Sequence, residues 1–141
     1  MIDQCGDHLV LIVNASRKDI DERHLRDSLS DVCTIDVLED RAMKPYQIDR
    51  VLMHLKHAGK LSKIRGIVLG DFPECDPPVA GSPSVRDVCA RILAPLGVPI
   101  VFGAPVGHTA RPMLTIPLGV RARLVAEGQG QLEILEPAVI A

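Results

Sequence analysis

The chain has 141 residues, a length typical of one domain, with a formal net charge of −2 and an aromatic content of only 2%. The absence of a basic stripe and the scarcity of aromatic rings argue against a nucleic-acid partner, which requires phosphate-binding charge or stacking platforms. The longest apolar runs fall far short of the ~20 residues that span a bilayer, and the N-terminus carries no export signal, so we expect a cytoplasmic protein without a membrane partner.

The first third of the chain predicts two strands around a weak helix. Residues 9–13 (LVLIV) form a continuous apolar run, which is typical of a strand buried on both faces. Residues 19–29 have a thin apolar stripe and an acidic start, which favours a short helix. Residues 32–38 alternate, with Ile35 and Val37 on one face and Asp36 on the other, so we expect a half-buried strand.

The middle of the chain continues the alternation of helices and strands. Pro45 can open a helix whose apolar residues recur at i, i+3, i+4 and i+7, and Gly59 can end it. Residues 64–70 predict a buried strand, and a proline-rich loop follows. Ser84 and Asp87 imitate a capping box at the start of the next helix.

The last third predicts a β-rich tail. Gly97 ends the second of these helices, and residues 98–102 form another buried strand. Residues 115–118 predict a short strand, and residues 120–125 and 131–135 predict a hairpin. Strands that alternate with helices indicate an α/β fold, here with a β-rich tail.

Two chemically capable side chains fall at predicted strand ends. Glu39 and Asp40 end the strand over 32–38, and His108 lies in a glycine-bounded loop after the strand over 98–102. Sites in open α/β sheets gather at the carboxyl ends of strands. A carboxylate and an imidazole that meet there could form the orienting pair of a catalytic triad, although a lone loop histidine is more often an ordinary surface residue.

Several separated motifs extend this pattern over residues 38–137. They are Leu38-Glu39-Asp40, PYQIDRVL at 45–52, HAGKL at 57–61, GIVLGDF at 66–72, Gly107-His108, TIPLG at 115–119, Ala122 and Leu124. In this order they resemble the C-terminal domain of the serine-type LD-carboxypeptidases, which include the muramoyltetrapeptide carboxypeptidases and the microcin-immunity members. The resemblance implies a mixed three-layer or swivelling-type α/β domain over residues 32–141, preceded by a non-matching βα segment over 1–31.

The resemblance also implies an activity. Such enzymes hydrolyse the bond from an L-centre to a terminal D-amino acid, mostly in murein tetrapeptides during peptidoglycan recycling, with a Ser-His-Glu triad. By motif position, the catalytic Glu is Glu39 and the catalytic His is His108. In this family the serine belongs to a preceding domain. The resemblance therefore implies three partners: a murein peptide, a separate serine-bearing domain and, in many members, a second copy of the chain. It implies neither a cofactor nor a metal.

This sequence departs from the family pattern in two places. Ser16 follows a predicted strand but lacks the flanking glycines of a nucleophile elbow, so we do not expect it to be a nucleophile. The family usually follows its Glu with an aliphatic residue, a small residue and a second Glu, where this chain has Arg41, Ala42 and Met43. We therefore expect negligible peptidase activity from the isolated chain.

The remaining polar candidates have simpler interpretations. His54 and His57 lie three residues apart on the polar side of a predicted helix, and no third metal ligand is evident, so we expect them to be exposed. Three arginines could meet an anionic substrate, but the simplest interpretation is that they lie on the surface. The simplest interpretation of Arg50 is that it forms an ion pair. The four cysteines lack paired metal-ligand spacing and should be buried or free thiols. The three arginines are Arg111, Arg121 and Arg123, and the four cysteines are Cys5, Cys33, Cys75 and Cys89.

Two alternatives to an enzyme stay open. The chain could be a non-catalytic remnant or a binding module derived from the family, and an adjacent reading frame with a serine elbow would argue against this. A small flavodoxin-like binding domain is the other alternative. Its phosphate loop would fall at residues 14–18, which contain no glycine to let a backbone approach a phosphate.

Overall fold

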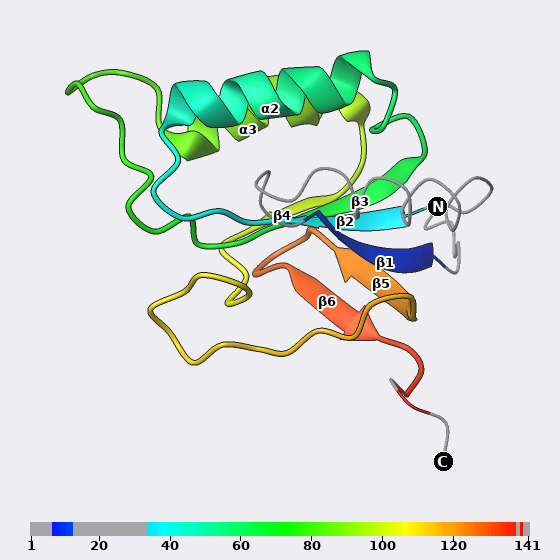
Figure 1. Cartoon of the computed structure of the whole chain (residues 1–141). Helices are drawn as coiled ribbons and strands as arrows, with labels where there is room; N and C mark the ends of the chain where they lie inside the picture. The colour runs from blue at the N-terminus through cyan, green and yellow to red at the C-terminus, as the bar shows by residue number, and fades with distance from the viewer. Residues whose placement is uncertain (1–6, 13–33, 138, 140–141) are drawn as a thin grey trace.

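A computed structural model describes residues 7–12, 34–137 and 139. Six strands form one sheet in the order β4-β3-β2-β1-β5-β6 (Figure 1). Four of them are mutually parallel, and the last two pair antiparallel, as expected for an α/β fold with a β-rich tail. The strands are β1 (Asp7–Ile12), β2 (Thr34–Leu38), β3 (Ile64–Leu69), β4 (Ile100–Phe102), β5 (Arg121–Val125) and β6 (Gln131–Ile134).

The helices α2 (Pro45–His57) and α3 (Val85–Leu93) cover one face of the sheet (Figure 1). α2 begins where the Gln47 side chain accepts a hydrogen bond from the Lys44 N–H at 2.8 Å. α3 begins at the predicted capping box, in which the Ser84 hydroxyl accepts from the Asp87 N–H while the Asp87 carboxylate accepts from the Ser84 N–H. A short 3₁₀ turn, η1 (Ala94–Leu96), extends α3 to Gly97, whose left-handed backbone ends it as expected.

Apolar side chains fill both sides of the sheet. The larger cluster joins β2, β3, α2 and α3, and includes Ile48, Ile67 and Ile92. The smaller cluster, on the opposite face, includes Val37, Val68 and others from β2, β3 and the segment after β4. The central strands β2 and β3 are therefore covered on both faces, as the continuous apolar run of β3 predicts.

The hairpin formed by β5 and β6 crosses beneath the parallel strands on the face opposite the helices (Figure 1). β5 pairs with β1 at only two positions and then diverges. Leu124 packs so closely under Gly66 that a β-carbon on this glycine would lie 2.8 Å from the leucine side chain. At the end of the hairpin, Gly130 similarly lies against Val101 of β4. The hairpin thus forms the lower layer of the domain.

The sequence expectations for β2 and for residues 115–118 are wrong. β2 is not half-buried: Asp36 is buried as fully as its apolar neighbours, because the strand lies inside a sheet that is covered on both faces. Residues 115–118 do not form a strand. Pro117 has no N–H to donate to a ladder, and the preceding Leu114 N–H instead donates to the Pro105 carbonyl at 2.8 Å.

The other expected helices and strands are present wherever the structure describes them, but the strand expected to be buried over residues 98–102 is only partly buried. The strands expected at 9–13, 32–38, 64–70, 98–102, 120–125 and 131–135 correspond to β1 to β6. The helix expected over residues 19–29 lies outside the described residues, as do Ser16, Cys5 and Cys33.

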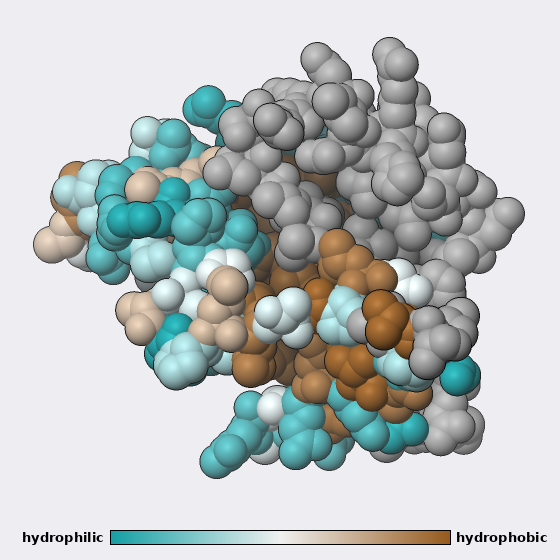
Figure 2. Space-filling view, turned by 60° about the horizontal axis from the view of Figure 1, so that its bottom comes forward, coloured by the Kyte–Doolittle hydropathy of each residue, from teal (hydrophilic) through white to brown (hydrophobic). Residues whose placement is uncertain are grey.

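The face opposite the helices carries exposed apolar side chains. Figure 2, turned so that this side comes forward, shows apolar residues gathered across its middle. Met113, Leu114 and Leu118, in the segment between β4 and β5, are each more than half exposed. Among the residues that the structure describes, no helix has the length and apolar character needed to cross a bilayer.

Candidate active site

Glu39 and His108 lie at the same edge of the sheet because two parallel strands of that sheet deliver them there. Glu39 follows β2, and His108 lies in the loop after β4, with β3 between the two strands. Backbone hydrogen bonds hold the outgoing chains together: Gly70 N–H donates to the Leu38 carbonyl, and Gly103 N–H donates to the Leu69 carbonyl. The sheet alone therefore brings together residues that are far apart in the sequence.

The Glu39 carboxylate contacts His108 twice through one oxygen. Oε2 lies 2.8 Å from the Nδ1 ring atom and accepts a hydrogen bond from the His108 backbone N–H at 2.9 Å. Because an ionised carboxylate only accepts hydrogen bonds, Nδ1 is the donor and carries the proton of the neutral ring. The glutamate side chain is 6% exposed and the histidine side chain 45%. The acid is thus enclosed, and among residues 34–137 the other ring nitrogen, Nε2, has no hydrogen-bond partner and could act as a base.

Two glycines make room for this contact. Gly107 has φ +63°, and a β-carbon there would lie 2.3 to 2.5 Å from three atoms of the Glu39 side chain, namely the carboxyl carbon, Oε2 and Cγ. On the other side, a β-carbon on Gly70 would lie 2.9 Å from the Glu39 β-carbon. Glu39 therefore occupies a slot that only glycine backbones can form.

A second carboxylate follows β3 at the same edge. Asp71 accepts hydrogen bonds from the Thr109 hydroxyl and from the Arg111 guanidinium, whose Nε lies 3.1 Å from Oδ2. The hydrogen bond from Thr109, together with Arg111, lowers the pKa of Asp71 below its usual value against the opposing effect of desolvation. Asp71 is thus an anion that binds the two residues just past His108.

Asp40 is close to the Glu39–His108 pair, but its carboxyl group has a different environment from that of Glu39. Its partial burial raises the pKa of the Asp40 carboxyl, and the neighbouring Glu39 carboxylate adds to the rise. No hydrogen bond joins the Asp40 side chain to His108 within the described residues. Position and contacts therefore distinguish the adjacent acids, and only Glu39 orients the ring.

The segment after Glu39, residues 41–43, is held in place by apolar packing, an ion pair and a backbone hydrogen bond. Met43 packs against the larger apolar cluster, at the position where the family usually has a second Glu. Arg41 pairs with Glu74 at 2.6 Å, and the Ala42 N–H donates to the Pro73 carbonyl, so this segment is bound to the loop after β3. The departure from the family pattern has thus replaced a polar position with an apolar contact.

The other candidates from the sequence lie apart from this pair. His54 and His57 are exposed on α2, and the described residues include no cluster of three or more potential metal-ligating side chains. Asp49 pairs with Arg91 of α3 rather than with its neighbour Arg50.

The arginines and cysteines have structural roles. Arg121 pairs with Glu136 and Arg123 with Glu133 along the hairpin, which agrees with surface positions for both. Cys75 and Cys89 are free and buried, and burial raises the pKa of the Cys89 thiol to about 12. Burial is also the main cause of the raised pKa of Cys75.

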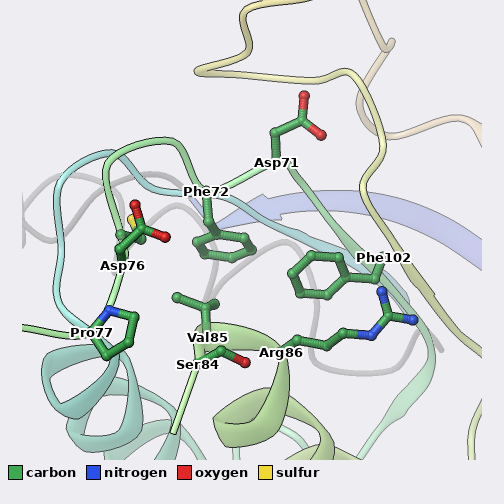
Figure 3. Close-up of a pocket in the computed structure, with 9 residues that line it drawn as sticks. Asp71, Phe72, Asp76, Pro77, Ser84, Val85, Arg86 and Phe102 are labelled. Carbon is green, nitrogen blue, oxygen red and sulfur yellow. The ribbon is translucent and has the colours of Figure 1, made fainter. Parts of the chain in front are cut away.

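A shallow pocket of about 180 Å³ lies beside Asp71 (Figure 3). The Phe72 and Phe102 rings stack in it with centroids 5.9 Å apart, and the Arg86 guanidinium lies 5.2 Å from the Phe102 centroid. In Figure 3 the Asp71 carboxylate points away from these rings. The pocket and the Glu39–His108 pair therefore lie on different sides of the chain at Asp71.

Asp71 and Gly107 are the site residues that the sequence analysis did not single out. Asp71 directly follows β3, just as Glu39 follows β2, so the strand-end rule applied to every strand would have found it. Gly107 was noted only as a neighbour of His108. The need for a residue without a β-carbon at this position depends on the position of Glu39, which no local pattern contains.

Comparison with known proteins gives a consistent result. A model of the LD-carboxypeptidase C-terminal domain matches residues 25–124. A putative carboxypeptidase of Synechocystis is 40% identical over 62% of this chain and 29% of its own length, and one of Streptomyces coelicolor is 37% identical over 72% of this chain and 31% of its own. A probable murein peptide carboxypeptidase of Bacillus subtilis is 36% identical over 62% of this chain. The chain spans less than a third of the length of each of these relatives.

Comparison with solved structures leads to the same family. The crystal structure of muramoyltetrapeptide carboxypeptidase from Oxalobacter formigenes superposes with a TM-score of 0.61 and 32% identity, covering 71% of this chain and 35% of that one. MccF in complex with glutamyl sulfamoyl guanosine superposes with a TM-score of 0.66 and 25% identity, covering 76% of this chain and 31% of that one.

The fold and the site together define an α/β domain that carries an acid–imidazole pair at the carboxyl ends of its parallel strands. The family match covers most of the chain and includes both members of the pair. The chain belongs to the LD-carboxypeptidase C-terminal domain family, as the sequence motifs indicated.

Proposed function

We propose that this chain supplies the acid–imidazole half of a serine-type LD-carboxypeptidase site that releases the terminal D-amino acid of a murein tetrapeptide. Glu39 holds the His108 proton on Nδ1, and Nε2 serves first as general base toward a serine hydroxyl and then as general acid toward the leaving amine. The observation that supports this best is the contact of one enclosed carboxylate oxygen with both the ring and the backbone of an exposed histidine.

The serine in this proposal comes from another domain. Within residues 34–137, the side-chain hydrogen bond of His108 goes to Glu39, while Ser62 donates to the Gly59 carbonyl and Ser84 caps α3. The exposed apolar side chains of Met113 and Leu114, in the same inter-strand segment as His108, are suited to contact such a domain. A murein peptide is the proposed substrate because the Bacillus subtilis and Oxalobacter formigenes relatives are named for it.

The test requires a serine-bearing domain and a matched pair of acids. We would join the chain to the N-terminal parts of both the Oxalobacter formigenes and the Bacillus subtilis relatives, and measure release of D-alanine from a murein tetrapeptide by mass spectrometry. The isolated chain should release none. Each active fusion should lose about 10⁴-fold in kcat when Glu39→Gln removes the orienting carboxylate. Asp40→Asn, at a position whose side chain makes no hydrogen bond to the ring within the described residues, should change the rate by about threefold or less.

Three outcomes would contradict the proposal. Turnover by the isolated chain would show that no second domain is needed. Equal losses in the Glu39 and Asp40 variants would remove the distinction between the two acids. Two folded but inactive fusions would instead favour the alternative that the chain is a non-catalytic remnant or binding module.

A further inference from the structure

The segment from Gly103 to Arg111, called here the His108 loop, is attached to the sheet by two carboxylates. Glu39, at the end of β2, binds the loop at His108 itself. Asp71, at the end of the neighbouring β3, binds it at Thr109 and Arg111. One attachment is at His108 and the other is at residues within three positions after it, so they act on the same short piece of chain.

The Arg111 side chain also closes this loop on itself. Its Nη2 atom donates both to Asp71 Oδ1 and to the Gly103 carbonyl, which joins the last residue of the loop to its first. The Thr109 hydroxyl, while donating to Asp71, accepts from the Arg111 N–H at 3.1 Å. Asp71 is therefore the common acceptor of a closed set of hydrogen bonds, and the hydrogen bonds from Thr109 and Arg111 lower its pKa.

The side of the loop before the histidine is held by other contacts: the Gly103 and Ala104 N–H groups both donate to the Leu69 carbonyl, and Val106 is buried in the smaller apolar cluster. Gly107, which joins this part to His108, has the greatest backbone freedom of any residue type, and a β-carbon there would collide with Glu39. The His108 side chain is 45% exposed, so packing contributes little to its orientation. The order of the ring therefore depends on Glu39, which contacts it directly, and on the backbone on both sides of His108, which on the Thr109 side is bound by Asp71.

We propose that Asp71 is a positioning residue, which holds the His108 imidazole in line with Glu39 by anchoring Thr109 and Arg111. The catalytic meaning of this inference rests on the proposed function, but its test does not use activity. A residue that only stabilised the fold would lower the melting temperature and leave the ring unchanged. A positioning residue changes the tautomer and the solvent exchange of the His108 ring while the rest of the domain stays folded.

The test is NMR spectroscopy of the whole chain labelled with ¹⁵N-histidine, at about pH 8 where an ordinary imidazole is neutral. His108→Gln assigns the ring signals. In the unchanged chain we expect the Nδ1–H tautomer to dominate, with slow exchange of that proton. In Asp71→Ala we expect the proton to exchange about fivefold faster or more, and the Nδ1–H population to fall.

The matched control is Asp49→Ala, which removes another carboxylate–arginine pair, Asp49 with Arg91, between α2 and α3. It should leave the His108 signals unchanged. If Asp71→Ala fails to fold, Thr109→Val and Arg111→Met each remove one of the anchored partners and should shift the same signals by smaller amounts.

The inference is overturned if the folded Asp71→Ala variant, or both of the partner variants, keep the exchange rate and tautomer of the unchanged chain. It is also overturned if Asp49→Ala alters the ring as much as Asp71→Ala does. Failure of the proposed function has a different signature, namely an inactive serine-domain fusion in which the His108 ring is ordered as in the isolated chain.

Discussion

Replacing Gly107 with alanine should disturb the contact between Glu39 and His108 although neither residue is altered. The added β-carbon would lie 2.3 Å from the Glu39 carboxyl carbon and 2.4 Å from Oε2, the oxygen that accepts both hydrogen bonds from His108. These separations are far inside van der Waals contact. The loop or the carboxylate must therefore move, and the two hydrogen bonds cannot both persist.

The free-energy loss has two parts. The left-handed φ of +63° costs a residue with a β-carbon about 1 kcal/mol. Loss of a hydrogen bond to a charged, enclosed group costs about 2 kcal/mol more. Gly107→Ala should therefore reduce the free energy of unfolding by about 3 kcal/mol, which lowers the melting temperature of a domain of this size by ~10 °C.

Gly59→Ala is the matched control. Gly59 has nearly the same φ, +70°, but a β-carbon there meets no atom within 4 Å. It should lose only the backbone part, about 1 kcal/mol. Urea unfolding followed by circular dichroism measures both variants, and equal losses in the two would refute the idea that Glu39 fills the space beside Gly107.

Three further predictions test other parts of the structure. Because the folded state lowers the pKa of Asp71, its carboxylate stabilises the fold above the ordinary value of 3.8, and this stabilisation is lost as the pH falls through the lower folded-state value. The difference in free energy of unfolding between the unchanged chain and Asp71→Asn should therefore narrow below about pH 4 in acid unfolding curves. A difference that stays constant with pH would contradict this. Gly66→Ala should lower the free energy of unfolding, measured in urea, by about 2 kcal/mol because its β-carbon meets Leu124 at 2.8 Å. In a chain that already carries Leu124→Ala, adding Gly66→Ala should be nearly neutral. Cys75 and Cys89 should resist alkylation at pH 8 until denaturant is added, as read by peptide mass spectrometry, because burial raises both thiol pKa values; rapid labelling of the folded chain would show that they are accessible.

The layout of the sheet could be predicted because its signals are local. Continuous apolar runs marked the parallel strands, and Ser84 with Asp87 marked the start of α3. Strand-end logic also predicted that Glu39 and His108 would meet, since the carboxyl ends of parallel strands share one edge. Their assignment as an acid and a base came from the family resemblance, and it stays a prediction until the fusion experiment is done.

What could not be predicted depends on contacts between distant segments. The burial of Asp36 follows from the position of β2 inside a sheet with two covered faces, and its alternating neighbours carry no sign of this. Residues 115–118 have the composition of a strand, but the Leu114 N–H is engaged by Pro105, nine residues earlier in the chain. The role of Asp71 likewise required knowing that β3 lies between the strands that deliver Glu39 and His108.

The position of the acid and the imidazole on one sheet has a kinetic consequence. Because a single folded layer sets their mutual geometry, docking of a serine-bearing partner would have only one reacting group left to align. Activity in a mixture of two separate chains would then rise with partner concentration until the docking surface saturates, with no slow conformational step between binding and turnover. Covalent tethering would raise the rate by increasing the effective concentration alone, and the saturated rate would be the same in the tethered and the untethered forms.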